Sequence, residues 1–248
     1  MFLDGLGIVL AGGTGRVGGA TLRAAVAGGA RVLVISRSRD SAERTIEGAL
    51  PEGARSRAVP FEADLLREED GESAVREALR RFGRLDAVVS LAGGGSRFVA
   101  IADSSVDDLR SNFENNAVAA YNLMVPALRA MLAQEPLPGA RSRGRLVAVT
   151  AGSTKDPQPR FGLMGAAKAA VNVLMQAIAR EHKADGIVAN AVVLGTVATE
   201  AARDYLDEAD FSAAASPEEV ADVLTFLAAD RASGINGALV DLNAREVD

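Results

Sequence analysis

Residues 6–20 read LGIVLAGGTGRVGGA and join a short apolar run to a glycine-rich turn. The run LGIVLA has the continuous apolar character of a strand that is buried on both faces. Gly12, Gly15 and Gly18 follow with the spacing G-x-x-G-x-x-G, and an alanine-rich helical segment begins there. Glycines in such a turn let the backbone approach a phosphate group, and the start of the helix offers unpaired N–H groups. The stretch therefore predicts a strand–turn–helix unit that binds the pyrophosphate of a dinucleotide.

Apolar runs and helical segments alternate along the rest of the chain. Strands are predicted at 6–11, 31–36, 85–92, 145–150, 186–193 and 238–242, with a weaker candidate at 56–61 that contains Pro60. Helices are predicted near 16–28, 40–49, 66–82, 105–134, 161–184 and 217–229. This order predicts one α/β domain over residues 1–248, a single doubly wound parallel sheet (a Rossmann fold) with helices on both faces. Loops are expected at 135–144 and at 195–216, and the second loop is long enough to form a lid over a substrate.

The composition narrows the classes of function. The 248 residues are 48% hydrophobic and 24% charged, which is typical of a soluble globular protein. The absence of cysteine excludes disulfides and thiolate chemistry, and the single histidine, His182, cannot form a metal cluster, so no metal site is predicted. A net charge of -6 argues against nucleic-acid binding, and no run of about 18 apolar residues indicates a membrane span. We expect a cytoplasmic protein with a small-molecule substrate.

The end of the second predicted strand bears on the choice of cofactor. An NAD site usually has an acidic residue there to bind the 2′-hydroxyl of the ribose. This chain has Ser36, Arg37, Ser38 and Arg39, and the first acid is Asp40. Arginine and serine side chains suit a 2′-phosphate, and Arg16 in the glycine turn could approach the same place. The pattern favours NADP(H) over NAD(H), and the alternative is that these arginines are plain surface charges.

Further motifs follow in a fixed order. They are Asp64-Leu65, Leu91-Ala92-Gly93, Asn116 in the segment NNAVAAYNL, Lys168, LGTVAT (194–199) and SPEEVADVLTFLAAD (216–230). Together with the glycine turn they resemble the short-chain dehydrogenase/reductase family nearly from end to end. Two details depart from its commonest pattern, because Arg16 stands at a glycine position of the turn and Leu194 replaces a proline.

The resemblance assigns roles to individual residues. It implies that Asp64 and Leu65 contact the adenine, that Asn116 serves structure and proton relay, and that Lys168 holds the nicotinamide ribose. The cofactor-binding residues that it implies, with the glycine turn, are Gly12, Thr14, Gly15, Arg16, Val17, Gly18, Ser36, Arg37, Ser38, Asp64, Leu65, Ala92, Gly93, Lys168, Gly195 and Val197.

The catalytic positions depart from the family. Its usual motif is Y-x-x-x-K, and four residues before Lys168 stands Met164; the family serine falls at Ala151. A thioether and a methyl group cannot donate a proton or stabilise an oxyanion. A second alignment is similar to the divergent enoyl-thioester reductases, whose motif is Y-x-x-M-x-x-x-K, and it puts Phe161 at the tyrosine. Either way the hydroxyl donor is missing.

Two functions remain open. The first is an NADP(H)-dependent oxidoreductase with a non-standard site, in which Lys168 and Asn116 are retained and water or a residue such as Ser153, Thr154 or Tyr205 replaces the donor. The second is a catalytically silent cofactor sensor, or the inactive partner of an active paralogue. Helices that are apolar around much of their circumference, as in VNVLMQAI (171–178), favour a homo-oligomer, a dimer or tetramer, or a complex with such a paralogue.

Overall fold

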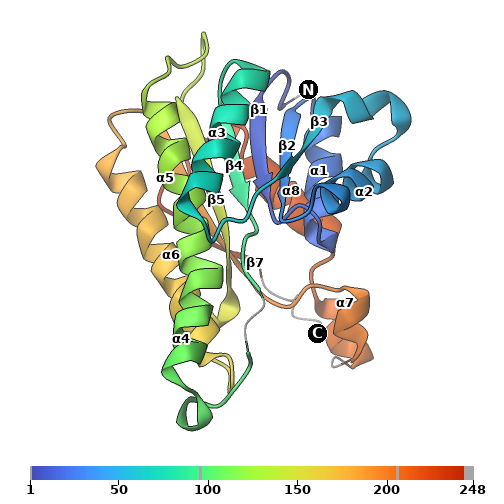
Figure 1. Ribbon diagram of the computed structural model, residues 1–248, viewed down its shortest axis with the longest axis vertical. Helices are drawn as coiled ribbons and strands as arrows, with labels where there is room; N and C mark the ends of the chain where they lie inside the picture. The colour runs from blue at the N-terminus through green and yellow to red at the C-terminus, as the bar shows by residue number, and fades with distance from the viewer. Residues whose placement is uncertain (1, 95–96, 205–206, 243–248) are drawn as a thin grey trace.

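The computed structural model describes residues 2–94, 97–204 and 207–242. A parallel seven-stranded sheet in the order β3-β2-β1-β4-β5-β6-β7 runs through the molecule (Figure 1). The strands are β1 (Gly7–Ala11), β2 (Arg31–Ser36), β3 (Ala58–Glu62), β4 (Ala87–Ser90), β5 (Gly144–Ala151), β6 (Ile187–Leu194) and β7 (Leu239–Leu242). The α-helices are α1 (Arg16–Ala27), α2 (Arg39–Ala49), α3 (Glu68–Phe82), α4 (Val106–Phe113), α5 (Ala119–Leu132), α6 (Gly162–Glu181), α7 (Glu208–Ala213) and α8 (Pro217–Leu227). The predicted doubly wound sheet is confirmed.

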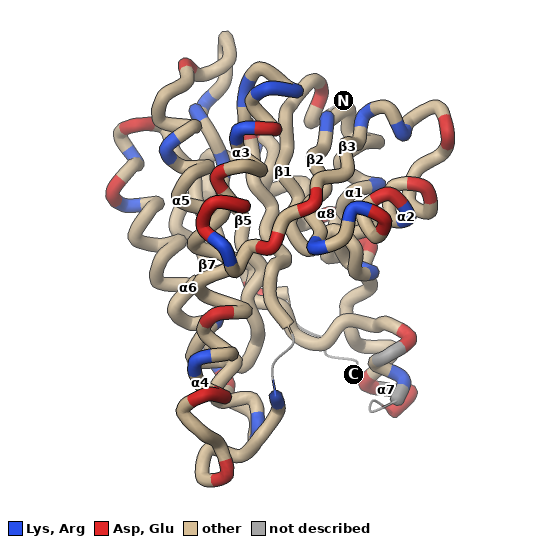
Figure 2. Tube along the Cα trace, viewed as in Figure 1, with Lys and Arg blue, Asp and Glu red and all other residues tan. Residues whose placement is uncertain are grey.

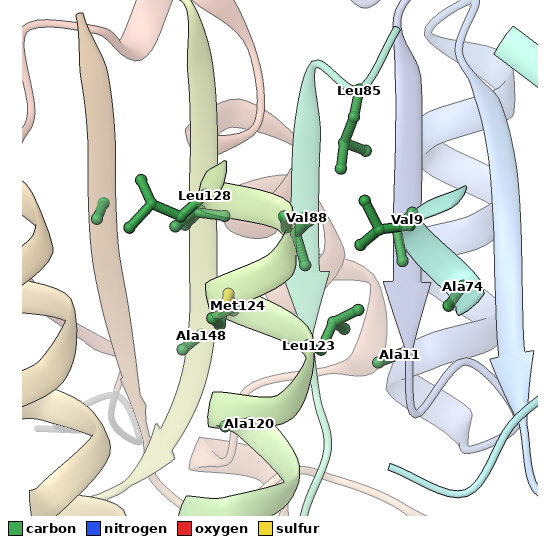
Figure 3. Close-up of a cluster of buried hydrophobic side chains, with 14 of the residues drawn as sticks. Val9, Ala11, Ala74, Leu85, Val88, Ala120, Leu123, Met124, Leu128 and Ala148 are labelled. Carbon is green, nitrogen blue, oxygen red and sulfur yellow. The ribbon is translucent and has the colours of Figure 1, made fainter. Parts of the chain in front are cut away.

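Helices cover both faces of the sheet and enclose two hydrophobic cores. On one face α3, α5 and α6 pack on the strands, and Leu123, Met124 and Leu128 of α5 reach Val88 of β4 and its neighbours (Figure 3). On the other face the core is built largely from α1, α2 and α8. Because both faces are buried, the central strands are apolar at almost every position, which is why they read as continuous runs in the sequence.

One contact between helices is unusually close. A Cβ atom on Gly71 of α3 would lie 2.0 Å from the carbonyl oxygen of Asn122 in α5. The Asn122 side chain donates a hydrogen bond to the carbonyl of Leu65, at 2.9 Å, and so ties α5 to the segment that precedes α3. Glycine at position 71 therefore sets the spacing of the two helices.

The connections reverse direction at β1. From β1 the chain moves outward to β2 and β3, and it then returns to β4 on the other side of β1. Ligands of open α/β sheets bind at such a point, beyond the carboxyl ends of the strands. The glycine-rich turn after β1 lies at this edge, as do the segments that follow β2, β3 and β4.

The predicted helix near 105–134 is confirmed as one helical run from Val106 to Leu132, with a π-helical turn in its middle that the sequence did not indicate. Residues Glu114–Val118 form a π-helical turn between α4 and α5. The amides of Asn112, Asn115 and Asn116 each donate a hydrogen bond to the backbone carbonyl four residues earlier, at 2.8–2.9 Å. Such bonds compete with the helical ladder and favour a local change in its spacing.

Two other elements differ in detail from expectation. The weak strand at 56–61 is β3 over Ala58–Glu62, and Pro60 is tolerated because β3 is an edge strand. The expected lid at 195–216 carries a 3₁₀ turn at Glu200–Asp204 and the short helix α7, and Val197 bridges to Ala215. Tyr205, the donor candidate in this segment, lies outside the described residues.

Helix α6 is apolar enough in length and composition to cross a membrane, although the sequence indicated no span. Half of its apolar window is buried inside the protein, where it packs on β5 and β6. A core helix of a layered α/β fold has the same composition, and this packing accounts for the apolar residues of α6.

Candidate functional site

The turn after β1 has the geometry that close approach of an anion requires. Gly12 adopts a φ of 72°, and a Cβ on Gly18 would lie 2.5 Å from the Gly12 carbonyl oxygen. Helix α1 begins at Arg16, and its N-cap residue, Gly15, makes no side-chain capping bond. The first N–H groups of α1 are therefore open to an external acceptor, which a phosphate group can supply.

A cavity of about 900 Å³ lies beyond the carboxyl ends of the strands and extends from this turn. Thirteen of the predicted cofactor residues line it: Gly12, Thr14, Gly15, Arg16, Val17, Gly18, Ser36, Arg37, Ser38, Asp64, Leu65, Ala92 and Gly93. Lys168, Gly195 and Val197 are not among the lining residues; Lys168 lies behind the lining residue Gly93, and the segment of Gly195 and Val197 contributes Thr199 and Glu200 instead. The turn, the size of the cavity and its mixed polar and apolar lining fit a dinucleotide.

Several lining residues were missed by the sequence analysis. They include Ser41, Gly94, Asn115, Ala119, Thr199 and Glu200. Asn115 and Ala119 reach the cavity from the π turn and from the start of α5, and periodicity gave no indication of that turn. Gly94 directly follows the predicted Gly93, and its position after β4 was the signal that could have identified it.

The corner of the cavity beside β2 is rich in cationic and hydroxyl groups. Among the described residues, Arg16 and Arg37 form no ion pair, whereas Arg39 is paired with Glu43 at 2.9 Å. Ser38 caps α2 by accepting a hydrogen bond from the Ser41 N–H. One acid is nearby, because the register places Glu62 of β3 opposite Ser36, and its carboxylate accepts the Arg39 N–H at 3.1 Å. This acid comes from the neighbouring strand and was not predicted from the sequence.

Lys168 lies at the other end of the site and is held by backbone groups. Its Nζ donates hydrogen bonds to the carbonyl of Ala92, at 2.9 Å, and to that of Val149, at 3.1 Å. The side chain is 8% exposed. Desolvation by burial lowers the pKa of Lys168 to about 8, because the charged form loses its water shell. The lysine that sequence reasoning singled out is thus a buried cation attached to the segments after β4 and along β5.

Gly93 brings Lys168 and Asn116 together. A Cβ on Gly93 would lie 2.5 Å from Nζ of Lys168 and 2.6 Å from Oδ1 of Asn116, and the φ of Gly93 is 144°. Asn116 is fully buried and also donates from Nδ2 to the Asn112 carbonyl. The π turn therefore presents Asn116 to the lysine, and the missing side chain of residue 93 makes room for both groups.

The positions of the expected hydroxyl donors hold no donor. Ala151 ends β5, Met164 lies one turn before Lys168 on α6, and Phe161 is the N-cap residue of that helix. The nearby candidates Ser153 and Thr154 form a 3₁₀ turn after β5, and their hydroxyl oxygens are buried. Ser153 lies against Gly165, where a Cβ would be 3.2 Å from its Oγ. Their role as donors stays a prediction.

The chain is similar to known proteins along most of its length. The family model described as short chain dehydrogenase matches residues 7–210. An NADPH-dependent aldehyde reductase-like protein of Arabidopsis thaliana is 29% identical over 156 residues, which are 59% of this chain and 55% of that protein. L-rhamnose 1-dehydrogenase (NAD(P)(+)) of Sphingomonas sp. is 28% identical and covers 96% of each chain. A short-chain type dehydrogenase/reductase structure from Mycobacterium ulcerans has a TM-score of 0.88 at 23% identity, covering 100% of this chain and 94% of that one.

Proposed function

Because this chain belongs to the short-chain dehydrogenase family, we propose that it binds NADP(H) in preference to NAD(H) and transfers hydride to or from a small carbonyl, enoyl or alcohol substrate. The observation that supports the proposal most directly is Lys168, which is buried and fixed beside Gly93 at the end of the dinucleotide-sized cavity. Titration with NADPH, followed by turnover assays with ketones and enoyl thioesters, tests it. Absence of dinucleotide binding would refute both the cofactor assignment and the role of Lys168.

Different residues of the site would bind the cofactor and assist the reaction. The nicotinamide cofactor, when bound, would donate the hydride in reduction and accept it in oxidation. The glycine turn and the start of α1 would hold its pyrophosphate, Asp64 and Leu65 would border the adenine end, and Lys168 would orient the nicotinamide ribose. Since no hydroxyl is present at residues 151, 161 or 164, we propose that water, or a nearby hydroxyl such as that of Ser153 or Thr154, takes the place of the family's proton donor. General acid catalysis is typically worth about 10²–10⁴-fold, so the reaction is slow relative to that of a complete site.

The preference for NADP(H) is assigned to Arg16 and Arg37. Replacing either one by alanine is expected to weaken NADPH binding about tenfold and to leave NADH binding nearly unchanged, since only NADPH carries the 2′-phosphate. The measurement is calorimetric titration with both cofactors at low and high salt, because the effect is screened by salt. Arg39→Ala is the matched control, as its guanidinium is engaged by Glu43. Equal losses for both cofactors would contradict the assignment.

A silent relative is the alternative proposal, and the side chains of Ala151, Met164 and Phe161 favour it. Such a protein would sense the cofactor or serve as the inactive partner of an active paralogue. Tight NADPH binding without turnover of the ketones and enoyl thioesters, even at high protein concentration, would support this alternative.

Restoring the hydroxyls separates the two functions. Ala151→Ser combined with Met164→Tyr is expected to raise the rate of carbonyl reduction by about 10²-fold or more, because it supplies an acid next to Lys168. The measurement is NADPH oxidation with a ketone panel. Ala151→Ser combined with Met164→Phe is the matched control, since it adds the same bulk without the second hydroxyl. No gain over this control would mean that the substrate site has diverged as well.

We also propose that the protein is a homo-oligomer, or that it pairs with an active paralogue, through α5 and α6. Val118, Tyr121 and Val173 are exposed apolar side chains in this region, and a cavity of about 240 Å³ lies between the two helices. Both helices carry few charged residues, whereas charges of both signs are mixed over the rest of the visible surface (Figure 2). The cytoplasmic location stays a prediction from the sequence.

A further inference from the structure

Three large apolar side chains stand exposed together at the carboxyl edge of the sheet. The rings of Phe98 and Phe161 lie with their centroids 4.6 Å apart and their planes tilted by 31°. Ile101 lies over Gly162, where a Cβ would be 3.0 Å from its Cδ1. Phe98 is 47%, Phe161 37% and Ile101 63% exposed. We call these three side chains the apolar wall.

The apolar wall shares one face of α6 with Lys168. Phe161, Met164 and Lys168 are spaced by three and four residues, so they lie on one face of α6. The helical bond from the Gly165 N–H to the Phe161 carbonyl, at 2.8 Å, brings Phe161 into this register. Seven residues of helix span about 10 Å. Phe98 follows shortly after Gly93 and Gly94, which border the dinucleotide cavity. The apolar wall therefore stands where a substrate would extend away from the nicotinamide.

The backbone beside the apolar wall is held in a conformation that costs energy. Arg160 has a φ of 71°. Among the residues that the structure describes, it is the only one other than glycine with a positive φ. Its Nη2 donates a hydrogen bond to the Phe98 carbonyl at 3.0 Å, which ties the two segments of the wall together. Strained residues of this kind persist where the surroundings fix them, often at ligand sites. The stacked rings are thus a fixed surface.

We propose that the apolar wall binds a flat apolar ring of the substrate, so that the substrates are aryl or cycloalkenyl carbonyl compounds and the corresponding alcohols. This inference rests on the proposed oxidoreductase function. None of the three side chains carries a hydrogen-bond donor or acceptor, so the wall offers no hydrogen bond to the hydroxyls of sugars and other polyols. Aromatic faces bind flat rings in offset or tilted stacks with centroids 4.5–7 Å apart, which is the geometry that Phe98 and Phe161 already show. A flexible alkyl chain would lose conformational freedom on the same surface.

Ligand-observed NMR with the NADPH-saturated protein tests the proposal without requiring turnover. The probes are 1-tetralone, a flat aryl ketone, and 2-decanone, a flexible ketone with the same number of carbon atoms. We expect 1-tetralone to bind at least about fivefold more tightly, and Phe98→Leu and Phe161→Leu each to weaken it about fivefold while 2-decanone changes little. Arg160→Gly keeps the backbone conformation, removes the bond to the Phe98 carbonyl, and is expected to weaken 1-tetralone binding as well.

The control is Phe2→Leu, which alters an exposed phenylalanine stacked under Arg231 and distant in sequence from the wall. It should leave both probe affinities unchanged. Equal affinity for the two probes, or unchanged 1-tetralone binding in the two wall variants, would overturn the proposal. So would a change of oligomeric state in those variants, measured by sedimentation, because a second copy of the chain would then cover the wall. NADPH titration of each variant reports separately on the proposed function.

Discussion

Replacing Gly93 by alanine is expected to weaken NADPH binding by about a hundredfold or more while the chain stays folded. The new Cβ would lie 2.5 Å from Nζ of Lys168 and 2.6 Å from Oδ1 of Asn116, well inside contact distance. The lysine must then leave the Ala92 and Val149 carbonyls, and the backbone at a φ of 144° is strained for any residue with a Cβ. A hundredfold loss corresponds to about 2.7 kcal/mol, which either effect can approach alone. Calorimetric titration gives the affinity, and far-ultraviolet circular dichroism reports the fold.

Gly94→Ala separates the two causes. Gly94 also has a positive φ, 111°, but a Cβ there would meet no atom within 4 Å. This variant therefore carries the backbone strain without the collision, and it should bind NADPH clearly better than Gly93→Ala. If the two variants lose the same affinity, the displacement of Lys168 is not the reason.

The largest expected loss of stability follows from Gly71→Ala. Its Cβ would lie 2.0 Å from the carbonyl oxygen of Asn122 and 2.7 Å from the carbonyl carbon, and backbone atoms cannot rotate away as a side chain can. Helices α3 and α5 must separate, which disturbs the core that both helices cover (Figure 3). We expect the free energy of unfolding to fall by about 3 kcal/mol or more, measured as a lower midpoint in urea.

Gly48→Ala is the matched comparison in another helix. Gly48 lies near the end of α2, and a Cβ there would meet nothing within 4 Å. Alanine should stabilise the helix by about 0.5–1 kcal/mol through its higher propensity. A loss of stability in both variants would show that the α3–α5 contact is not the determining factor at Gly71.

The sheet was predictable because its signal is local. Strands buried on both faces are apolar at successive positions, as in GIVLA of β1 and RVLVIS of β2, and the turn after β1 marks the start of α1. The π turn inside the helix over 105–134 was not predicted, because three asparagines bond to carbonyls of the preceding turn, which periodicity does not reveal. The position of β3 at the edge, which makes Pro60 acceptable, is likewise a property of the whole sheet.

Some residues of the site were likewise predictable from the sequence, and others became evident only in the structure. The glycine turn could be identified from spacing, since it follows directly after a strand, and Asp64 from the resemblance to the family. Glu62 opposite Ser36, and Thr199 in the cavity lining, depend on which segments the fold brings side by side. The ring pair of Phe98 and Phe161 joins segments 63 residues apart in the chain and has no pattern in either one. Sequence motifs indicated the cofactor end of the site, and the substrate end required the structure.

The hydrogen bonds from Lys168 to two backbone carbonyls give this lysine a structural role in addition to its proposed role in cofactor binding. Without that side chain the part-buried oxygens of Ala92 and Val149 would lose its hydrogen bonds, at a cost of up to about 1–3 kcal/mol for each group left without another partner. Selection for a stable fold would therefore preserve the lysine in a lineage that no longer needed the reaction. A hydroxyl at residue 151 or 164 would have no comparable structural role, and mutation can remove it without unfolding the chain. Lys168 therefore supports cofactor binding without distinguishing an enzyme from a silent relative, and the variants that restore hydroxyls at residues 151 and 164 make that distinction.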